Sequence, residues 1–267
     1  MITAGIDVGS TTCKTVLLEG EKVLGQTIIP SGSIPSKSAV EVFDKCCNET
    51  GVGKSKIDAV AVTGYGRRLA GFGDMVITEI KACGLGAINT PSPLGRIFTI
   101  VDVGGQDTKV ISLNETGDVE DFAMNDKCAA GTGRFLEVLA HKLELTYEQF
   151  VEVALTSKNM IHMNSTCAVF AESEVVSLLA RGIDKADIAA AATNSIADRV
   201  CSMMRRVGQK ETICFAGGGA RNRALVKAVE ENINVKIFVP QQPQTMIALG
   251  AAIAARDKIT GKPKTNE

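Results

Sequence analysis

The chain has 267 residues, 45% of them hydrophobic and 22% charged, which suits a globular protein of one large or two small domains. A formal net charge of −1, no Trp and only two Tyr argue against nucleic acid as a partner. Because the sequence has no apolar run of about 18 residues and no basic leader, we expect a cytoplasmic protein with no membrane partner.

A duplicated motif organises the chain. The first copy, IDVGSTTCK, covers residues 6–14, and the second, VDVGGQDTK, covers residues 101–109. In both copies Asp-Val-Gly leads to Lys at the same offset, which indicates a strand, a tight glycine turn and a second strand. A further turn and strand follow at residues 23–29 and 119–123. We therefore expect each half of the chain to open with a three-stranded meander.

Helical patterns alternate with strands in the rest of each half. Apolar strands that end in glycines are expected at residues 59–66 and 213–219, and helices at residues 36–49, 79–88, 132–143, 169–181, 188–207, 223–231 and 245–256. This order predicts two α/β lobes with mixed sheets. Lobe I comprises residues 1–95 and is completed by the C-terminal helix at 245–257. Lobe II comprises residues 96–244, and residues 258–267 form a flexible tail. Small residues at 248–252 would let the last helix cross a neighbour closely.

The two glycine turns point to phosphate and metal binding. Their backbone N–H groups can approach phosphate oxygens. Asp7 and Asp102 lie at the strand end before each turn, where a carboxylate can hold Mg²⁺ through water molecules. Lys14 or Lys109 could neutralise phosphate charge. One turn alone is more simply a hairpin, but two in register predict a clamp for a triphosphate.

Residues 7–11, 102–107 and 216–222 resemble the phosphate 1, phosphate 2 and adenosine motifs of the superfamily of actin, sugar kinases and Hsp70. The resemblance implies an actin-like, ribonuclease H-like fold with ATP or ADP in a cleft between the lobes. It implies Mg²⁺ at Asp7 and Asp102 and catalytic roles for Asp102, Gln106 and Asp107, with Gln106 preferred for orienting the attacking water. The nucleotide-binding residues would be Gly9, Ser10, Thr11, Thr12, Lys14, Gly104, Gly105, Gln106, Gly217, Gly218, Gly219 and Asn222.

Eight cysteines are present without a C-x-x-C spacing. Cys128 and Cys167 each precede a predicted helix, where the positive end of the helix dipole lowers a thiol pKa and favours thiolate ligation. The alternative is that both are small residues near helix caps. The remaining thiols are interpreted as core or surface residues, among them Cys13, Cys46, Cys47, Cys201 and Cys214.

Residues 125–137 and 165–174 resemble the two cluster-ligand segments of the family of 2-hydroxyacyl-CoA dehydratase activators and benzoyl-CoA reductase ATPase subunits. The resemblance implies a homodimer in which Cys128 and Cys167 of both subunits hold one [4Fe–4S] cluster. It implies an ATPase that passes one electron from ferredoxin or flavodoxin to a 2-hydroxyacyl-CoA dehydratase. Alternatives are the ATPase subunit of a benzoyl-CoA reductase, a small-metabolite kinase, for which the chain is short, and a non-catalytic nucleotide switch or polymer.

Overall fold

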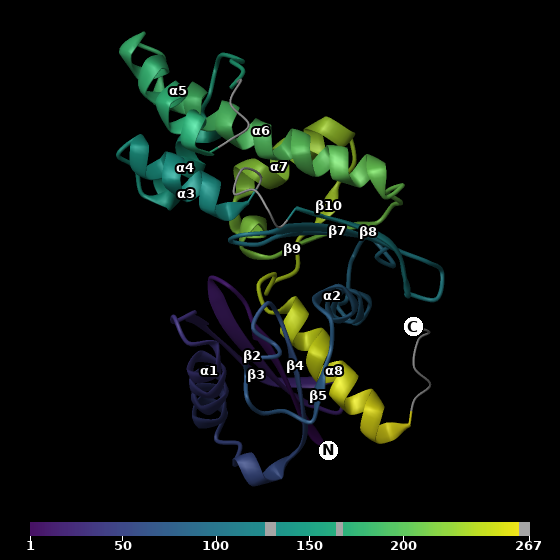
Figure 1. Cartoon of the computed structure of the whole chain (residues 1–267). Helices are drawn as coiled ribbons and strands as arrows, with labels where there is room; N and C mark the ends of the chain where they lie inside the picture. Colours follow the sequence, from purple (N-terminus) through teal and green to yellow (C-terminus); the bar gives the residue numbers. More distant parts are fainter. Residues whose placement is uncertain (126–131, 164–167, 262–267) are drawn as a thin grey trace.

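The computed structural model describes residues 1–125, 132–163 and 168–261, which form two five-stranded mixed sheets (Figure 1). The N-terminal sheet has the order β3-β2-β1-β4-β5, and the C-terminal sheet has the order β10-β9-β6-β7-β8. The strands are β1 (Ile2–Val8), β2 (Thr12–Glu19), β3 (Lys22–Pro30), β4 (Ile57–Thr63), β5 (Met75–Val76), β6 (Thr99–Val103), β7 (Thr108–Leu113), β8 (Val119–Asn125), β9 (Ile213–Ala216) and β10 (Ile237–Phe238).

The two sheets repeat one topology. β1 pairs antiparallel with β2 and parallel with β4, while β6 pairs antiparallel with β7 and parallel with β9. The third meander strand, β3 or β8, follows on the outer side of β2 or β7. The expected pair of meanders and the mixed α/β fold class are both confirmed. The two-residue edge strands β5 and β10 were not expected, because they are too short to show an alternating pattern.

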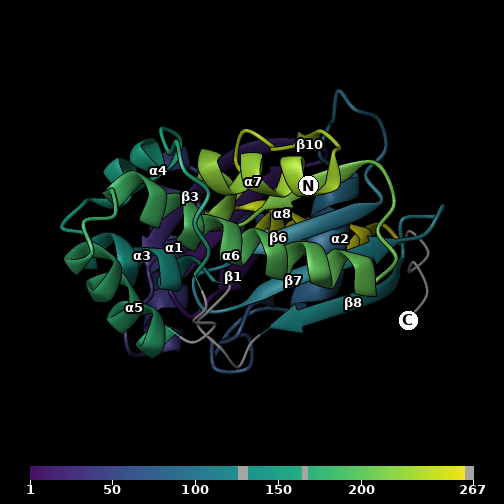
Figure 2. The same cartoon turned by 90° about the horizontal axis from the view of Figure 1, so that it is seen from above.

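The helices cover these sheets on both faces. α1 packs on one face of the N-terminal sheet, and α2 and α8 lie between the two sheets (Figure 1). Seen from above, α6 and α7 lie over the outer face of the C-terminal sheet, with α3, α4 and α5 beside them (Figure 2). The helices are α1 (Pro35–Thr50), α2 (Glu79–Ile88), α3 (Gly133–Lys142), α4 (Tyr147–Ala154), α5 (Ala168–Ala180), α6 (Lys185–Arg206), α7 (Arg223–Ile233) and α8 (Met246–Thr260), with short 3-10 turns at Lys54–Lys56 and Gly218–Arg221.

Three helices differ from the sequence prediction. α4 was not predicted, although Thr146 and Gln149 form a reciprocal capping box at its start. α6 begins before the predicted residue 188, because the Asp184 side chain caps it by accepting a hydrogen bond from the Ala186 N–H. α8 continues to Thr260, beyond the predicted end at residue 256. Within the described ranges, no helix is long and apolar enough to cross a membrane.

α2 and α8 cross at close range between the sheets. A Cβ atom on Gly250 of α8 would lie 2.6 Å from the carbonyl carbon of Ala82 and 2.7 Å from the backbone nitrogen of Gly86, both in α2. Gly86 in turn faces the backbone of Met246. The predicted close crossing of the last helix is therefore confirmed. Around it, one hydrophobic cluster joins α2 and α8 to strands of both sheets, so this crossing ties the two halves together.

Asp187, in the first turn of α6, anchors the loop that follows α4. Its carboxylate accepts hydrogen bonds from the Asn159 side chain (2.8 Å), the Ser157 hydroxyl (2.8 Å) and the backbone N–H groups of Lys158 and Asn159 (3.1 Å each). These donors, led by Asn159 and Ser157, lower the pKa of Asp187 to about 2. The charged form of Asp187 therefore fastens this loop to α6.

Candidate functional site

A cleft of about 480 Å³ opens where the glycine turns of the two sheets meet. Asn222 does not line it: this residue is buried, caps α7 by accepting a hydrogen bond from the Leu225 N–H, and donates to the Tyr147 hydroxyl at 3.3 Å. The structure brings the other predicted nucleotide-site residues together on the cleft wall, namely Asp7, Gly9, Ser10, Thr11, Thr12, Lys14, Asp102, Gly104, Gly105, Gln106, Asp107, Gly217, Gly218 and Gly219. Their individual ligand roles stay predictions.

The two phosphate turns face each other across this cleft. A Cβ atom on Gly105 in the second turn would lie 2.9 Å from the Cβ of Thr11 in the first. The second turn is closed by a 2.9 Å hydrogen bond from the Gly104 N–H to the Asp107 carbonyl. It is also tied to α3, since the Gly133 N–H donates to the Gly104 carbonyl at 2.9 Å. This is the opposed arrangement that a two-turn phosphate clamp requires.

Asp7 and Asp102 occupy equivalent places in the two sheets. Each lies near the end of its strand, is 3% exposed and lines the cleft. Each also contacts a glycine at the end of the neighbouring parallel strand, Gly64 (φ 96°) beside Asp7 and Gly217 (φ 78°) beside Asp102. A side chain at either glycine would overlap the carboxylate, so glycine provides both the backbone geometry and the space. Two carboxylates facing one cleft are suitable oxygen donors for Mg²⁺.

The strand register explains the constant offset between Asp and Lys. Lys14 lies directly opposite Asp7 in the first hairpin, and Lys109 lies opposite Asp102 in the second. The Lys14 ammonium is 2.9 Å from Asp7, and the Lys109 ammonium is 3.4 Å from Asp102. Although burial acts to lower it, the Asp7 carboxylate raises the pKa of Lys14. Both lysines therefore balance the aspartates, and a phosphate would have to compete for them.

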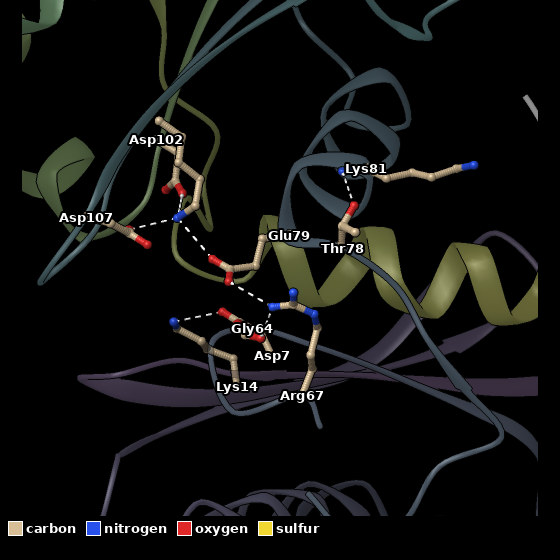
Figure 3. Close-up of polar contacts among 10 residues, drawn as sticks. Asp7, Lys14, Gly64, Arg67, Thr78, Glu79, Lys81, Asp102 and Asp107 are labelled. Atoms are coloured by element: carbon tan, nitrogen blue, oxygen red, sulfur yellow. Dashed lines mark hydrogen bonds and ion pairs between the residues drawn. The ribbon is translucent and has the colours of Figure 1, made fainter. Parts of the chain in front are cut away.

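Lys109 is the centre of a larger charged cluster that sequence reasoning missed (Figure 3). Its ammonium also lies 2.7 Å from Asp107 and 3.1 Å from Glu79, and the second oxygen of Glu79 lies 3.7 Å from Arg67. Burial raises the pKa of Glu79, with the Lys109 ammonium opposing the shift. Burial likewise raises the pKa of Asp102, again opposed by Lys109. No local signal around Glu79 or Arg67 could have placed them here, because three separate elements contribute to the cluster.

The two candidates for orienting water differ in their surroundings. The Asp107 carboxylate is held by Lys109, and it also lies 2.7 Å from where a Cβ of Gly104 would be. Gln106 is exposed at the tip of the turn and lines the cleft. This difference favours Gln106 over Asp107, and the role of Gln106 remains a prediction.

The far wall of the cleft comes from α4 and the segment around α7. This wall was missing from the sequence prediction because α4 was missing. Arg223 forms an ion pair with Glu152 across the two helices at a short distance. Lining residues on this side are Tyr147, Glu148, Val151, Glu152, Arg221, Arg223 and Gln244. The capping box at Thr146 and Gln149 was the signal that could have revealed it.

The predicted cluster ligands Cys128 and Cys167 lie outside the described residues. The chain is described again from Thr132, which caps α3, and from Ala168, where α5 begins. Burial raises the pKa of Cys201 to about 11 and that of Cys214 to about 12, so both thiols stay protonated. Among the described residues, no group of three or more His, Cys, Asp or Glu side chains could hold a metal ion. The six described cysteines, all buried, are Cys13, Cys46, Cys47, Cys83, Cys201 and Cys214.

Comparison with known proteins places these features in a family. A model of the BadF/BadG/BcrA/BcrD ATPase family matches residues 4–255. The chain is 41% identical to the 2-hydroxyisocaproyl-CoA dehydratase activator of Clostridioides difficile, over 97% of this chain and 96% of that protein. It is 39% identical to the (R)-2-hydroxyglutaryl-CoA dehydratase activating ATPase of Acidaminococcus fermentans, over 96% and 97%. It is also 32% identical to one of the benzoyl-CoA reductase polypeptides of Thauera aromatica, over 87% and 83%.

Solved structures agree with this placement. The activator of the 2-hydroxyisocaproyl-CoA dehydratase from Clostridium difficile with bound ADPNP has a TM-score of 0.91 and 39% identity, covering 100% of this chain and 98% of that chain. A ROK hexokinase from Thermus thermophilus, 15% identical with a TM-score of 0.55 over 98% and 100%, shows a shared fold alone. The expected relation to actin-like ATPases and sugar kinases is thus confirmed. The chain belongs to the BadF/BadG/BcrA/BcrD ATPase family, and ATP hydrolysis is its activity.

Proposed function

We propose that the protein activates a 2-hydroxyacyl-CoA dehydratase by passing it single electrons as ATP is hydrolysed. The observation that carries the proposal is the similarity, over nearly the full length of both chains, to proteins named as dehydratase activators. Those proteins serve different acyl groups at 41% and 39% identity. The proposal therefore names the class of dehydratase and no particular acyl chain.

ATP would lie in the cleft with its phosphates between the two turns. The opposed turns support this, since N–H groups of Gly9 and Gly105 can reach phosphate oxygens from both sides. Asp7 and Asp102 would hold Mg²⁺, and Gln106 would orient the attacking water. The nucleotide would then lie between lobe I, residues 1–95 with 245–257, and lobe II, residues 96–244.

We assign the cluster ligands to Cys128 and Cys167 of two subunits. A [4Fe–4S] cluster takes four thiolates, so a chain that offers two must pair with a second copy. Six of the eight cysteines are buried, which leaves these two as the ligand candidates. When bound, the cluster supplies one-electron transfer. Reduced ferredoxin or flavodoxin would supply the electron.

Iron and sulfide analysis of the protein purified without oxygen tests this assignment, together with its mass in solution. We expect a homodimer with about four iron and four sulfide per dimer. A monomer with that cluster content would contradict the shared site. An iron-free protein that still hydrolyses ATP would contradict the electron-transfer proposal.

Two alternatives have weaker support. A role as the ATPase component of a benzoyl-CoA reductase rests on 32% identity over 83% of the relative. That role would be recognised by stimulation of a benzoyl-CoA reductase in place of a dehydratase. A metabolite kinase has support from the fold alone. It would produce a phosphorylated metabolite at the rate of ATP consumption.

A further inference from the structure

We propose that Glu79 is a positioning residue for ATP hydrolysis. It would hold the Lys109 ammonium in place between Asp102 and Asp107 and join this cluster, through Arg67, to the N-terminal half. The inference rests on the proposed nucleotide site and adds a residue that the phosphate turns do not contain. Glu79 would act through Lys109 and would make no contact with the reacting phosphate.

Glu79 is fixed by the start of α2. It is the first residue of this helix, directly after the cap Thr78, whose hydroxyl accepts a hydrogen bond from the Lys81 N–H at 3.3 Å. Its side chain is 16% exposed and lines the cleft. α2 itself is locked to α8 by the glycine crossing, so the Glu79 backbone has little freedom to move. In Figure 3 the Glu79 carboxylate points toward Lys109, whereas the Lys81 side chain points away.

The donors of Lys109 are fully used. An ammonium group has three N–H donors, and Lys109 has carboxylate oxygens of Asp107, Glu79 and Asp102 at 2.7, 3.1 and 3.4 Å. Its side chain is 2% exposed, so water cannot readily replace a lost partner. Three oxygens around one nitrogen fix its direction. Removing one of them leaves a buried donor that must find another acceptor.

That freed donor would turn toward the polyphosphate. Without the negative charge of Glu79, Lys109 is held by two carboxylates and the strongest nearby anion becomes the bound nucleotide. Such a contact forms in the ground state, so it preserves or strengthens nucleotide binding. It also draws Lys109 away from Asp102, the proposed metal carboxylate, and so slows turnover. A positioning role therefore predicts loss of turnover without loss of affinity.

Arg67 extends the cluster to the other side of the cleft. Its guanidinium lies 3.7 Å from Glu79 and donates to the Gly64 carbonyl at 2.9 Å, and Gly64 lies against Asp7. A continuous polar path thus runs from the Asp7 strand end to Lys109. Because Arg67 acts on Lys109 through Glu79, its effect should vanish once the Glu79 charge is gone.

The test compares Glu79→Gln with Lys81→Gln in the full-length protein purified without oxygen. Gln keeps the size of Glu79 and removes its charge, and Lys81→Gln removes a charge from the same helical turn. We expect Glu79→Gln to lower turnover at saturating ATP at least about tenfold, since a buried charged hydrogen bond is lost. The Kd for ADPNP with Mg²⁺ should stay within about threefold or become tighter. Lys81→Gln should change neither quantity, and Glu79→Asp, which keeps the charge, should retain more turnover than Glu79→Gln.

A double-mutant cycle completes the test. Arg67→Met should lower turnover by about threefold alone and by no further factor in the Glu79→Gln background. Glu79→Gln with turnover within about twofold of the unchanged protein would overturn the inference. Affinity that falls in step with turnover would also overturn it, because a general structural defect would act on both. Asp102→Asn is measured in parallel: if it too loses neither affinity nor turnover, the nucleotide site itself is misassigned.

Discussion

Replacing Gly250 by Ala is expected to destabilise the protein strongly, because the new methyl group has no space at the α2–α8 crossing. Its Cβ would lie 2.6 Å from the carbonyl carbon of Ala82, 2.7 Å from the nitrogen of Gly86 and still closer to the Ala82 oxygen. All three atoms are backbone, so no side-chain rotation relieves the overlap. Overpacking a core costs about 1–3 kcal/mol, and rigid neighbours on both sides place this site near 3 kcal/mol. For a chain of this size, that lowers the Tm by about 6–12 °C.

Thermal unfolding followed by circular dichroism measures this effect, with Gly84→Ala as the matched control. A Cβ on Gly84, in the same helix, would lie 3.5 Å from Leu113 and 3.6 Å from Val119, which is ordinary contact. Ala in a helix interior is favoured over Gly by about 0.5–1 kcal/mol, so this control should raise the Tm. A Gly250→Ala protein that unfolds at or above the temperature of the unchanged protein would refute the close crossing.

Three further predictions concern the cleft, the cluster and the α6 anchor. Asp102→Ala should lower Mg²⁺-dependent ATP turnover at least about tenfold, for a lost metal contact of about 1–2 kcal/mol; undiminished turnover would exclude the Mg²⁺ assignment. Cys128→Ser or Cys167→Ser should remove the visible absorbance and iron of the cluster while Cys46→Ser keeps both, and full iron in either variant would remove that ligand. The Asp187 pKa of about 2 lies below its unfolded value of about 3.9, so its stabilisation is present above about pH 4 and lost toward pH 2. Asp187→Asn should therefore lower the Tm at pH 7, with the difference from the unchanged protein narrowing as the pH falls from about 4 to 2; equal Tm values at pH 7 would contradict the anchor.

The repeated features of the fold were the ones open to prediction from sequence. Asp7 and Lys14 are joined by a single hairpin, so their offset is a local property, and the second copy shows it again. The parallel strand ending at Gly64 could be recognised for the same reason. Two copies in register made the opposed turns predictable, although nothing local shows that Gly105 would approach Thr11.

The charged cluster could not be predicted, because its members meet only in the folded chain. Lys109 comes from a strand of the C-terminal sheet, Glu79 from the start of α2 and Arg67 from the loop after β4. α4 is a different case, since the capping box at Thr146 and Gln149 was present in the sequence and was overlooked. Tertiary contacts determined the first feature, and a local signal would have sufficed for the second.

ATP-dependent activation of a dehydratase tests the central proposal most directly. An inactive, oxidised 2-hydroxyacyl-CoA dehydratase is mixed without oxygen with this protein, a strong one-electron reductant and ATP, and dehydration of the acyl-CoA is followed. We expect activity only when protein, reductant and ATP are all present, and none when ADPNP replaces ATP. A dehydratase that stays inactive here, while an established activator switches it on under the same conditions, would contradict the proposed function.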